Sequence, residues 1–423
     1  MAIGTTPRIS TARGAWVKPE SAFSLRQPAI AFIFVTGVLD VMAMGLVIPV
    51  LPPLIEEFAG SRSGAGLWNG VLTALWAGMQ FLCSPVIGSL SDRYGRRPVI
   101  LISTAGLAID WVLMALAPNL WWLALGRIIG GITSSSFTAS YAYMADVTTP
   151  DQRARAYGLV GAAFSLGFVA GPALGGVLGA WGPRVPFWVA AGLSSLAFVY
   201  GWLILPESLP EEKRMAFAWS RANPLGSLRL LRSHPELSSL AAVTLLLHFA
   251  HHVFSVVYVL YAYHRYGLGA FEVGLMLALA GVLDMIMQGL VVGRVVKRFG
   301  DRKTMVIGLI GGTLGLVAVG LAPTPEWFVA ALFPNALWGL AMPTLLSLMT
   351  QRVAENEQGQ LQGANNSVAS IAGIVSPIFF GWVYSLSVSV PGSSFLIAAV
   401  ILAVAATIGF FATRGSADGH ANP

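Results

Sequence analysis

The chain has 423 residues, of which 56% are apolar and only 10% are charged. Soluble domains average about 25% charged residues, so this composition excludes a soluble globular protein. The formal net charge is +6, and we interpret the basic excess as a signal of membrane topology rather than of nucleic-acid binding. Cys83 is the single cysteine, which excludes an intramolecular disulfide.

The N-terminal segment 1–27 is polar and contains Arg8, Arg13, Lys18 and Arg26. A secretory signal peptide would instead carry a short apolar core and a cleavage site of small residues. We therefore predict a cytoplasmic N-terminal tail, and a second cytoplasmic tail at 414–423.

Apolar stretches of membrane-spanning length recur along the chain, each sufficient to cross about 30 Å of hydrocarbon as a helix. Twelve are predicted, at 29–51, 67–90, 98–117, 120–143, 157–180, 185–205, 238–263, 270–293, 303–322, 326–350, 361–385 and 392–413. An outer-membrane barrel would show strands of about 10 residues with alternating polarity, a pattern that this sequence lacks. The sequence thus predicts an all-α membrane protein.

Basic residues are distributed unevenly between the two predicted faces. With the N-terminus inside, the inner tails and loops hold 21 of the 25 Lys and Arg residues. The outer loops hold Arg62, Arg184 and Arg265, and Arg127 lies inside a span. This asymmetry follows the positive-inside rule and predicts a multi-pass protein of the cytoplasmic (inner) membrane with both termini in the cytoplasm.

Segment 206–237 is the one long polar stretch in the interior of the chain, and it contains several charged residues and prolines. We interpret it as a cytoplasmic linker between two six-helix bundles, 28–205 and 238–413. The charged loop 88–97 is repeated in degenerate form at 293–303, about 205 residues later.

Two further landmarks repeat in the same order. The stretch 152–158 matches 357–363, and Gly171-Pro172 matches Ser376-Pro377. The sequence therefore predicts two parallel pseudo-repeats, an arrangement in which transporters bind substrate between the halves near the bilayer midplane.

The loop between the second and third spans, which we call the signature loop, is the first candidate functional feature. Its distinctive residues are Gly88, Asp92, Arg93, Gly95, Arg96 and Arg97. The arginines can act as membrane anchors on the inner face. An acid in a basic loop, Asp92, suggests a specific ion pair or a contact with a neighbouring helix N-terminus.

The fifth span carries a run of small residues around a proline. These are Gly167, Gly171, Pro172, Gly175 and Gly176. Small residues let helix backbones approach closely in a membrane, and proline removes one backbone hydrogen bond and kinks the helix. The run predicts a tight helix–helix contact.

Ionisable side chains inside the spans are candidate functional groups, because burying charge in hydrocarbon is costly. They are Asp40, Asp110, Arg127, Asp284 and the histidines His248, His251 and His252. Asp110 and Arg127 are predicted at similar depth on adjacent helices, where they could equally form a permanent structural ion pair. The histidines could equally be core residues bonded to backbone groups.

The pattern G-x-x-x-D-R-x-G-R-R of residues 88–97 resembles the signature loop of the major facilitator superfamily of secondary transporters. The pattern G-x-x-x-G-P-x-x-G-G of residues 167–176 resembles the motif of its drug:proton antiporters. Further stretches are similar to the tetracycline-efflux branch over nearly the whole chain: 39–52, 126–133, 145–148, 206–208 and 358–363. The resemblance implies a conformational switch at the signature loop.

In the tetracycline-efflux branch, the counterparts of Asp40, Asp110 and Arg127 are needed for transport, so the resemblance implies the same roles here. The second half departs from that family, which usually has a histidine where this chain has Asp284 and an acid where this chain has Gly311-Gly312. Those family residues bear on proton coupling or on the drug, which can arrive as a divalent-metal chelate. We therefore hypothesise that Asp284 and His252, with His248, form a second protonatable centre.

The sequence thus predicts a proton-driven antiporter that exports a small amphipathic compound, most simply a tetracycline-like drug, by alternating access. Candidate residues of a central binding cavity are Gln80, Tyr141, Asn335 and Trp338. We expect no cofactor and no nucleic acid, with a monomer in the lipid bilayer sufficient for transport. No Walker-type run is present, so ATP is not the expected energy source.

Two alternatives stay open at this stage. An uptake symporter for a small metabolite would share the fold but would give no reason for the Gly-Pro motif of residues 167–176. A metal-binding membrane enzyme or receptor is the more remote alternative, because His248, His252 and Asp284 are of metal-ligating type. No H-E-x-x-H pattern supports it, and we predict no resident metal and no enzymatic activity.

Overall fold

A computed structural model describes most of the chain, at residues 26–134, 137–149, 153–217, 223, 226–354 and 357–414. Residues 1–25 and 415–423, which include most of the two predicted tails, lie outside the described residues. Every regular element in the described part is helical, which confirms the predicted all-α architecture.

The first half of the described chain contains eight α-helices. They are α2 (Arg26–Val47), α3 (Leu51–Ala59), α4 (Arg62–Tyr94), α5 (Arg96–Ala115), α6 (Leu120–Ser134), α7 (Phe137–Val147), α8 (Arg153–Gly179) and α9 (Val185–Ile204). The short 3-10 helices η1 (Glu211–Lys213) and η2 (Gly226–Leu228) and the helix α10 (Arg229–Ser233) follow before the second half begins.

The second half is built in the same way but is interrupted more often. Its α-helices are α11 (Pro235–Val253), α12 (Val259–Tyr266), α13 (Ala270–Ile286), α14 (Val292–Leu321), α15 (Pro325–Ala330), α16 (Leu332–Ala336), α17 (Ala341–Thr350), α18 (Gln358–Leu386) and α19 (Ser393–Ala412). Two π-helices, η3 (Phe254–Tyr258) and η4 (Met287–Val291), and the 3-10 helix η5 (Leu337–Leu340) join them.

Ten segments of the described chain are long and apolar enough to cross a membrane. One of them, Ala270–Leu321, is 52 residues long, more than twice what one crossing needs, and its helix is kinked at Gly300. The predicted span 120–143 is divided between α6 and α7, and positions 135–136 between these helices lie outside the described residues. The count is therefore consistent with the twelve predicted spans.

The first two spans differ from the predicted boundaries. The first continues past a turn after Val47 into α3, and the second begins at Arg62 rather than at residue 67. Local capping explains the early start of α4. Gly60 adopts a left-handed conformation with φ of 67°, and the Ser61 hydroxyl accepts a hydrogen bond from the Gly64 amide at 3.1 Å.

The predicted repeat of the charged loop is visible in the backbone. Gly95 ends α4 with φ of 103°, and Gly300, about 205 residues later, kinks α14 with φ of 76°. Both values lie where residues with a side chain are disfavoured. The same residue type at the same place in each half therefore lets the chain reverse between two successive spans.

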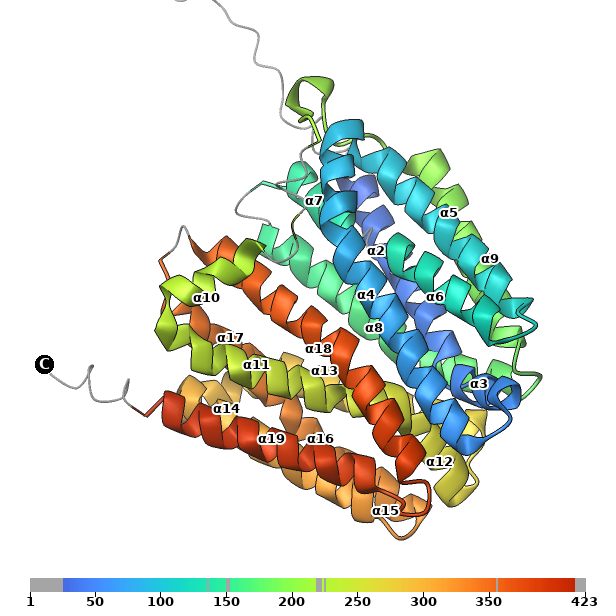
Figure 1. Ribbon diagram of the computed structural model, residues 1–423. Helices are drawn as coiled ribbons and strands as arrows, with labels where there is room; N and C mark the ends of the chain where they lie inside the picture. Colours follow the sequence, from blue (N-terminus) through green and yellow to red (C-terminus); the bar gives the residue numbers. More distant parts are fainter. Residues whose placement is uncertain are drawn as a thin grey trace, which may run out of the picture.

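The helices form two bundles that lie side by side (Figure 1). In that view α2–α9 lie together at the upper right and α11–α19 at the lower left. Between the bundles α4 lies beside α18, and α8 lies beside α13. We call the end with Gly95, Gly300 and residues 205–217 the linker side, and the end with α3, α12 and residues 387–392 the distal side.

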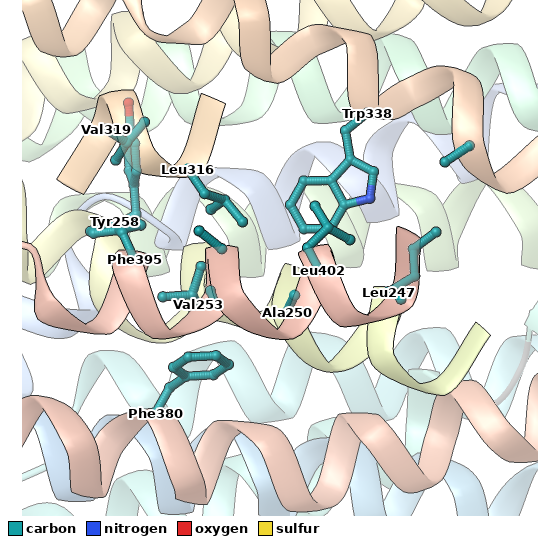
Figure 2. Close-up of a cluster of buried hydrophobic side chains, with 14 of the residues drawn as sticks. Leu247, Ala250, Val253, Tyr258, Leu316, Val319, Trp338, Phe380, Phe395 and Leu402 are labelled. Carbon is teal, nitrogen blue, oxygen red and sulfur yellow. The ribbon is translucent and has the colours of Figure 1, made fainter. Parts of the chain in front are cut away.

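The interior of the second bundle is a large aromatic and aliphatic cluster (Figure 2). Tyr258 and Phe395 are 1% and 0% exposed, and Phe380 is likewise fully buried. Large apolar side chains such as Leu203 and Leu314 are exposed on the outer surface at 71% and 59%. A surface of that kind matches contact with lipid rather than with water.

Candidate transport site

A cavity lies between the two bundles on the linker side. Its volume is about 470 Å³, and α4 and α18 form its facing walls. Polar side chains predominate in the wall: Gln80, Ser84, Thr138, Asn223, Asn366, Ser367 and Ser370. Asn223 belongs to the predicted linker, so this end of the cavity lies near the linker side. Its size and mixed lining suit a drug-sized amphipathic molecule.

The four predicted lining residues are placed differently from one another. Gln80 lies in the cavity wall, and Tyr141 is not among its lining residues. Trp338 is 6% exposed within the apolar cluster of Figure 2, where its ring packs edge-on against His251 with centroids 5.5 Å apart. Asn335 packs its backbone against Gly315 of α14. Neither Trp338 nor Asn335 is among the residues that line this cavity, and the Trp338 side chain is buried inside its own bundle.

Asp40 lies in the middle part of α2. Its Oδ1 atom is buried and has no hydrogen-bond partner among the described residues. The neighbouring turn of α2, at Val41 and Met42, packs against Gly167 of α8. A carboxylate left without a partner inside a spanning helix is costly, so Asp40 stays a candidate functional residue.

Asp110 and Arg127 face the same helix pair, α5 and α6, but form no ion pair within the described structure. The Asp110 carboxylate packs against the glycine face of α6, where a Cβ atom built on Gly126 would lie 2.8 Å from Oδ1. The Arg127 guanidinium instead donates to the Met114 sulfur at 3.0 Å and lies 5.8 Å from the Trp111 ring centroid. The two charges influence each other electrostatically without direct contact.

Two of the three histidines of α11 bond the backbone of their own helix, and the third, His251, packs against Trp338. The His248 and His252 Nδ1 atoms bond the backbone carbonyls of Thr244 and His248 at 2.9 and 2.7 Å. The His252 Nε2 atom faces Gly373 of α18. Because a carbonyl only accepts, Nδ1 carries the hydrogen in both rings.

Asp284 lies near the end of α13. It accepts a hydrogen bond from the Gln288 amide at 2.7 Å and faces Gly339 of η5. The structure does not bring Asp284 and His252 together, so the predicted paired centre is wrong for this conformation. The reason is rotational: similar depth in the membrane does not place two side chains on facing sides of their helices. The described residues also contain no group of three potential metal ligands.

The glycine motif of α8 packs against two neighbours at once. Gly167, Gly171 and Gly175 recur every four residues and lie directly against α2. On another face, a Cβ atom built on Gly176 would lie 2.6 Å from the carbonyl oxygen of Ala270, and Gly274 meets the carbonyl of Pro172. The predicted tight contact therefore joins α8 both to its own bundle and to α13 of the other bundle.

A second backbone contact of the same kind joins α4 of the first bundle to α18 of the second bundle. Gly70 of α4 meets the carbonyl of Pro377 in α18, and a Cβ atom built on Gly381 would lie 2.5 Å from the carbonyl oxygen of Gly66. Pro377 and Gly381 lie 205 residues after Pro172 and Gly176, and Gly66 and Gly70 lie 204 residues before Ala270 and Gly274. We call these two contacts the α8–α13 seam and the α4–α18 seam.

Hydrogen bonds strengthen the closure on the distal side. The buried Asn69 side chain donates from α4 to the Val256 carbonyl of the π-helix η3 at 2.7 Å. Ser63 donates to the Ser385 carbonyl at 3.2 Å. Both bonds join the two bundles. With its seams closed on the distal side and its cavity on the linker side, the structure represents a linker-side-open conformation.

The signature loop forms a polar network on the linker side. Arg96 bonds Asp92 at 2.6 Å and Asp146 at 3.1 Å, so the ion pair expected of Asp92 is present. The neighbouring helix N-terminus is capped by another residue, since Glu207 accepts hydrogen bonds from the amides of Arg96 and Arg97 at 2.8 and 3.2 Å.

The remaining residues of the signature loop have simpler positions. Gly88 approaches Thr138 of α7, and the Arg93 guanidinium lies 5.1 Å from the Tyr94 ring centroid. Arg97 donates to the Trp202 carbonyl of α9 at 2.8 Å. The sequence interpretation missed Glu207 as a partner of this loop, although its place just after the sixth span was a usable signal.

Comparison with known proteins decides the family. The model of the Major Facilitator Superfamily matches residues 33–377 and, in a second alignment, 240–423. The chain belongs to the major facilitator superfamily.

Relatives of this superfamily member include tetracycline resistance proteins. The class C protein of Escherichia coli is 38% identical over 361 residues, covering 85% of this chain and 91% of that protein. The class G protein of Vibrio anguillarum is 36% identical, with coverage of 85% and 91%.

Solved structures agree on the fold of this major facilitator protein. The nucleoside transporter NupG superposes with a TM-score of 0.75 at 14% identity, covering 91% of this chain and 99% of that one. A bacterial homologue of the human lysosomal transporter Spinster gives 0.72 at 18% identity, covering 92% and 97%. Membership of the superfamily makes the chain a multi-pass membrane transporter of small molecules rather than an enzyme.

Proposed function

We propose that this protein is a proton-coupled exporter of a tetracycline-like compound, working by substrate:proton antiport. The observation that carries the proposal is its likeness to tetracycline resistance proteins over most of both chains. The polar-walled cavity between α4 and α18 supports it, because one amphipathic drug molecule would fit there.

The proposal places the protein in the cytoplasmic (inner) membrane with both termini and the linker side in the cytoplasm. The halves 28–205 and 238–413, joined by 206–237, act as the two rocking bundles of alternating access. A monomer in the bilayer suffices, and no cofactor is needed. The cavity would then load drug, free or as a divalent-metal chelate, from the cytoplasm.

Within this cycle the ionisable residues have separate roles. Asp40 is the proposed proton-coupling carboxylate, and Asp110 and Arg127 support it from the α5–α6 interface. His248, His252 and Asp284 are proposed as individual protonatable or polar groups near the path, no longer as one centre. The signature loop, with Asp92 and Arg96, is the proposed conformational switch.

Everted membrane vesicles from a pump-deficient bacterial host test the proposal directly. An imposed proton gradient is followed with a pH-sensitive dye, and tetracycline with Mg²⁺ is then added. The proposal expects the drug to dissipate the gradient in vesicles with the native protein and not in vesicles with Asp40→Asn. A gradient unaffected by any tetracycline, in vesicles that contain folded protein, would refute tetracycline antiport.

A further inference from the structure

An ionisable contact joins the two bundles on the distal side. The Nε2 atom of His264, near the end of α12, lies 2.7 Å from Oε2 of Glu56 on α3. The Nδ1 atom of the same ring lies 2.5 Å from the Tyr384 hydroxyl on α18. Among the ion pairs formed between described residues, Glu56–His264 is the one that connects α2–α9 with α11–α19.

The chemistry of the three groups fixes where the hydrogens lie. A carboxylate only accepts, so the His264 Nε2 atom donates to Glu56. A neutral ring then accepts the Tyr384 hydroxyl hydrogen at Nδ1. When Nδ1 gains a proton, the hydroxyl can turn to accept it, and the ring becomes a cation facing the Glu56 carboxylate. The contact therefore exists in both proton states but is stronger when the ring is charged.

The surroundings of the contact give the ring access to water. His264 and Tyr384 line a cavity of about 150 Å³ on the distal side, together with Arg62 of α4 and Arg265 of α12. The Glu56 side chain is 30% exposed and the His264 side chain 14%. The ring therefore faces the Glu56 carboxylate, which is opposite in charge to a protonated imidazole, and two arginines of the same charge, at a cavity on the distal side.

We propose that His264 is a proton-binding latch, in which a proton taken from the distal side strengthens the contact with Glu56 and holds the distal side closed. Tyr384 is the positioning residue, because its hydroxyl orients the ring. The transport consequence rests on the proposed function: after drug release outside, an external proton on His264 would favour return to the linker-side-open state. A proton gradient would then drive the same step that the antiport cycle requires.

Distance measurements between spin labels test the latch without drug or gradient, so the outcome is independent of whether tetracycline is exported. The single native cysteine allows a Cys83→Ser background, with labels at Trp181→Cys in the first bundle and Val388→Cys in the second. Both positions are exposed on the distal side, at 75% and 37%. The fraction of long distances, which reports an open distal side, is measured between about pH 5.5 and 8.5, a range that brackets imidazole titration.

Three variants separate the latch from a merely structural contact. In the native protein the open fraction falls on acidification. His264→Gln keeps a donor and an acceptor in place but cannot take up a proton, so its open fraction should vary with pH much less than that of the native protein. His264→Ala and Glu56→Gln should raise the open fraction at low pH by roughly tenfold, as expected for loss of a charge-assisted hydrogen bond.

Glu57→Gln is the matched control, because Glu57 is the adjacent, exposed carboxylate on α3 and should leave the pH profile unchanged. An open fraction that does not change with pH in the native protein would overturn the proposal. So would a His264→Gln variant that keeps the native pH dependence.

Discussion

The two ends of the molecule are held in different ways. On the distal side, backbone seams and hydrogen bonds such as Asn69–Val256 cross from one bundle to the other. On the linker side, the ion pairs of the signature loop stay within the first bundle, between Asp92, Arg96 and Asp146. Contacts between the bundles therefore define this conformation on the distal side, whereas the ion pairs of the linker side do not oppose a movement of one bundle relative to the other.

A strong polar network at one end of the molecule therefore does not by itself hold the two bundles together at that end. The degenerate repeat of this loop at 293–303 behaves in the same way. Asp301 accepts hydrogen bonds from Ser347 and Gln351, and Arg302 bonds Thr413, all within the second bundle. Each loop keeps its own bundle rigid in this state, so the bundles can move as units.

The largest expected effect comes from Asp40, which lies between the two ends. Asp40→Asn should reduce export to background while leaving the distal seams closed, because it removes a titratable group and no contact between bundles. Drug efflux from loaded cells and the distal label distance are measured together. Wild-type efflux by Asp40→Asn would exclude Asp40 as the coupling carboxylate.

A bulky residue in a seam should destabilise the closed distal side. Gly70→Leu would push into the carbonyl of Pro377. Overpacking typically costs about 1–3 kcal/mol, so the closed distal state should lose roughly tenfold or more in population, with a matching loss of export. Gly192→Leu is the control, because a Cβ atom at Gly192 meets nothing within 4 Å. Equal effects of the two changes would show that the seam has no special role.

A smaller effect is expected on the linker side. Asp92→Asn removes the charge of a pair that is 32% exposed at Asp92, so solvent weakens the interaction. We expect turnover to fall about threefold to tenfold while drug affinity stays within a factor of about two, because Asp92 lies outside the cavity wall. Equilibrium binding and initial transport rates are compared, and parallel losses in both would contradict a switching role.

The smallest expected effect is the coupling between Asp110 and Arg127. Both Asp110→Asn and Arg127→Ala should lower the melting temperature in detergent. Because the two charges interact without direct contact, the double variant should depart from additivity by only about 0.5 kcal/mol. A double variant that is clearly more stable than Arg127→Ala alone would instead show that they pair in another state of the cycle.

The sequence predicted the architecture well, because span length, charge bias and an internal repeat are local signals. It also predicted the close packing of Gly171, and of the two alternatives that it left open for Asp92 the structure contains the ion pair. It did not predict which way side chains face, since these spans are apolar almost all round and so give no preferred face. For this reason Trp338 was assigned to the cavity although it is buried, and Asp284 was paired with His252.

Contacts between distant segments could not be predicted from the sequence, for a different reason. Glu56 and His264 are separated by more than 200 residues, and neither lies in a recognisable motif. The carbonyl that Asn69 bonds belongs to a π-helix, a local change of helical register that often occurs at functional sites and has no reliable sequence signature. Both contacts depend on how the bundles dock, which no single span determines.

The seams have a consequence for how this protein can diversify. They are made of main chain against main chain, at Gly70 with Pro377 and at Gly274 with Pro172, so their fit depends on the absence of side chains. The cavity wall, by contrast, is made of side chains such as Gln80 and Asn366. Selection for a new drug can therefore exchange residues of the cavity wall while the two seams stay unchanged. Substrate choice and the movement of the bundles thus depend on different residues.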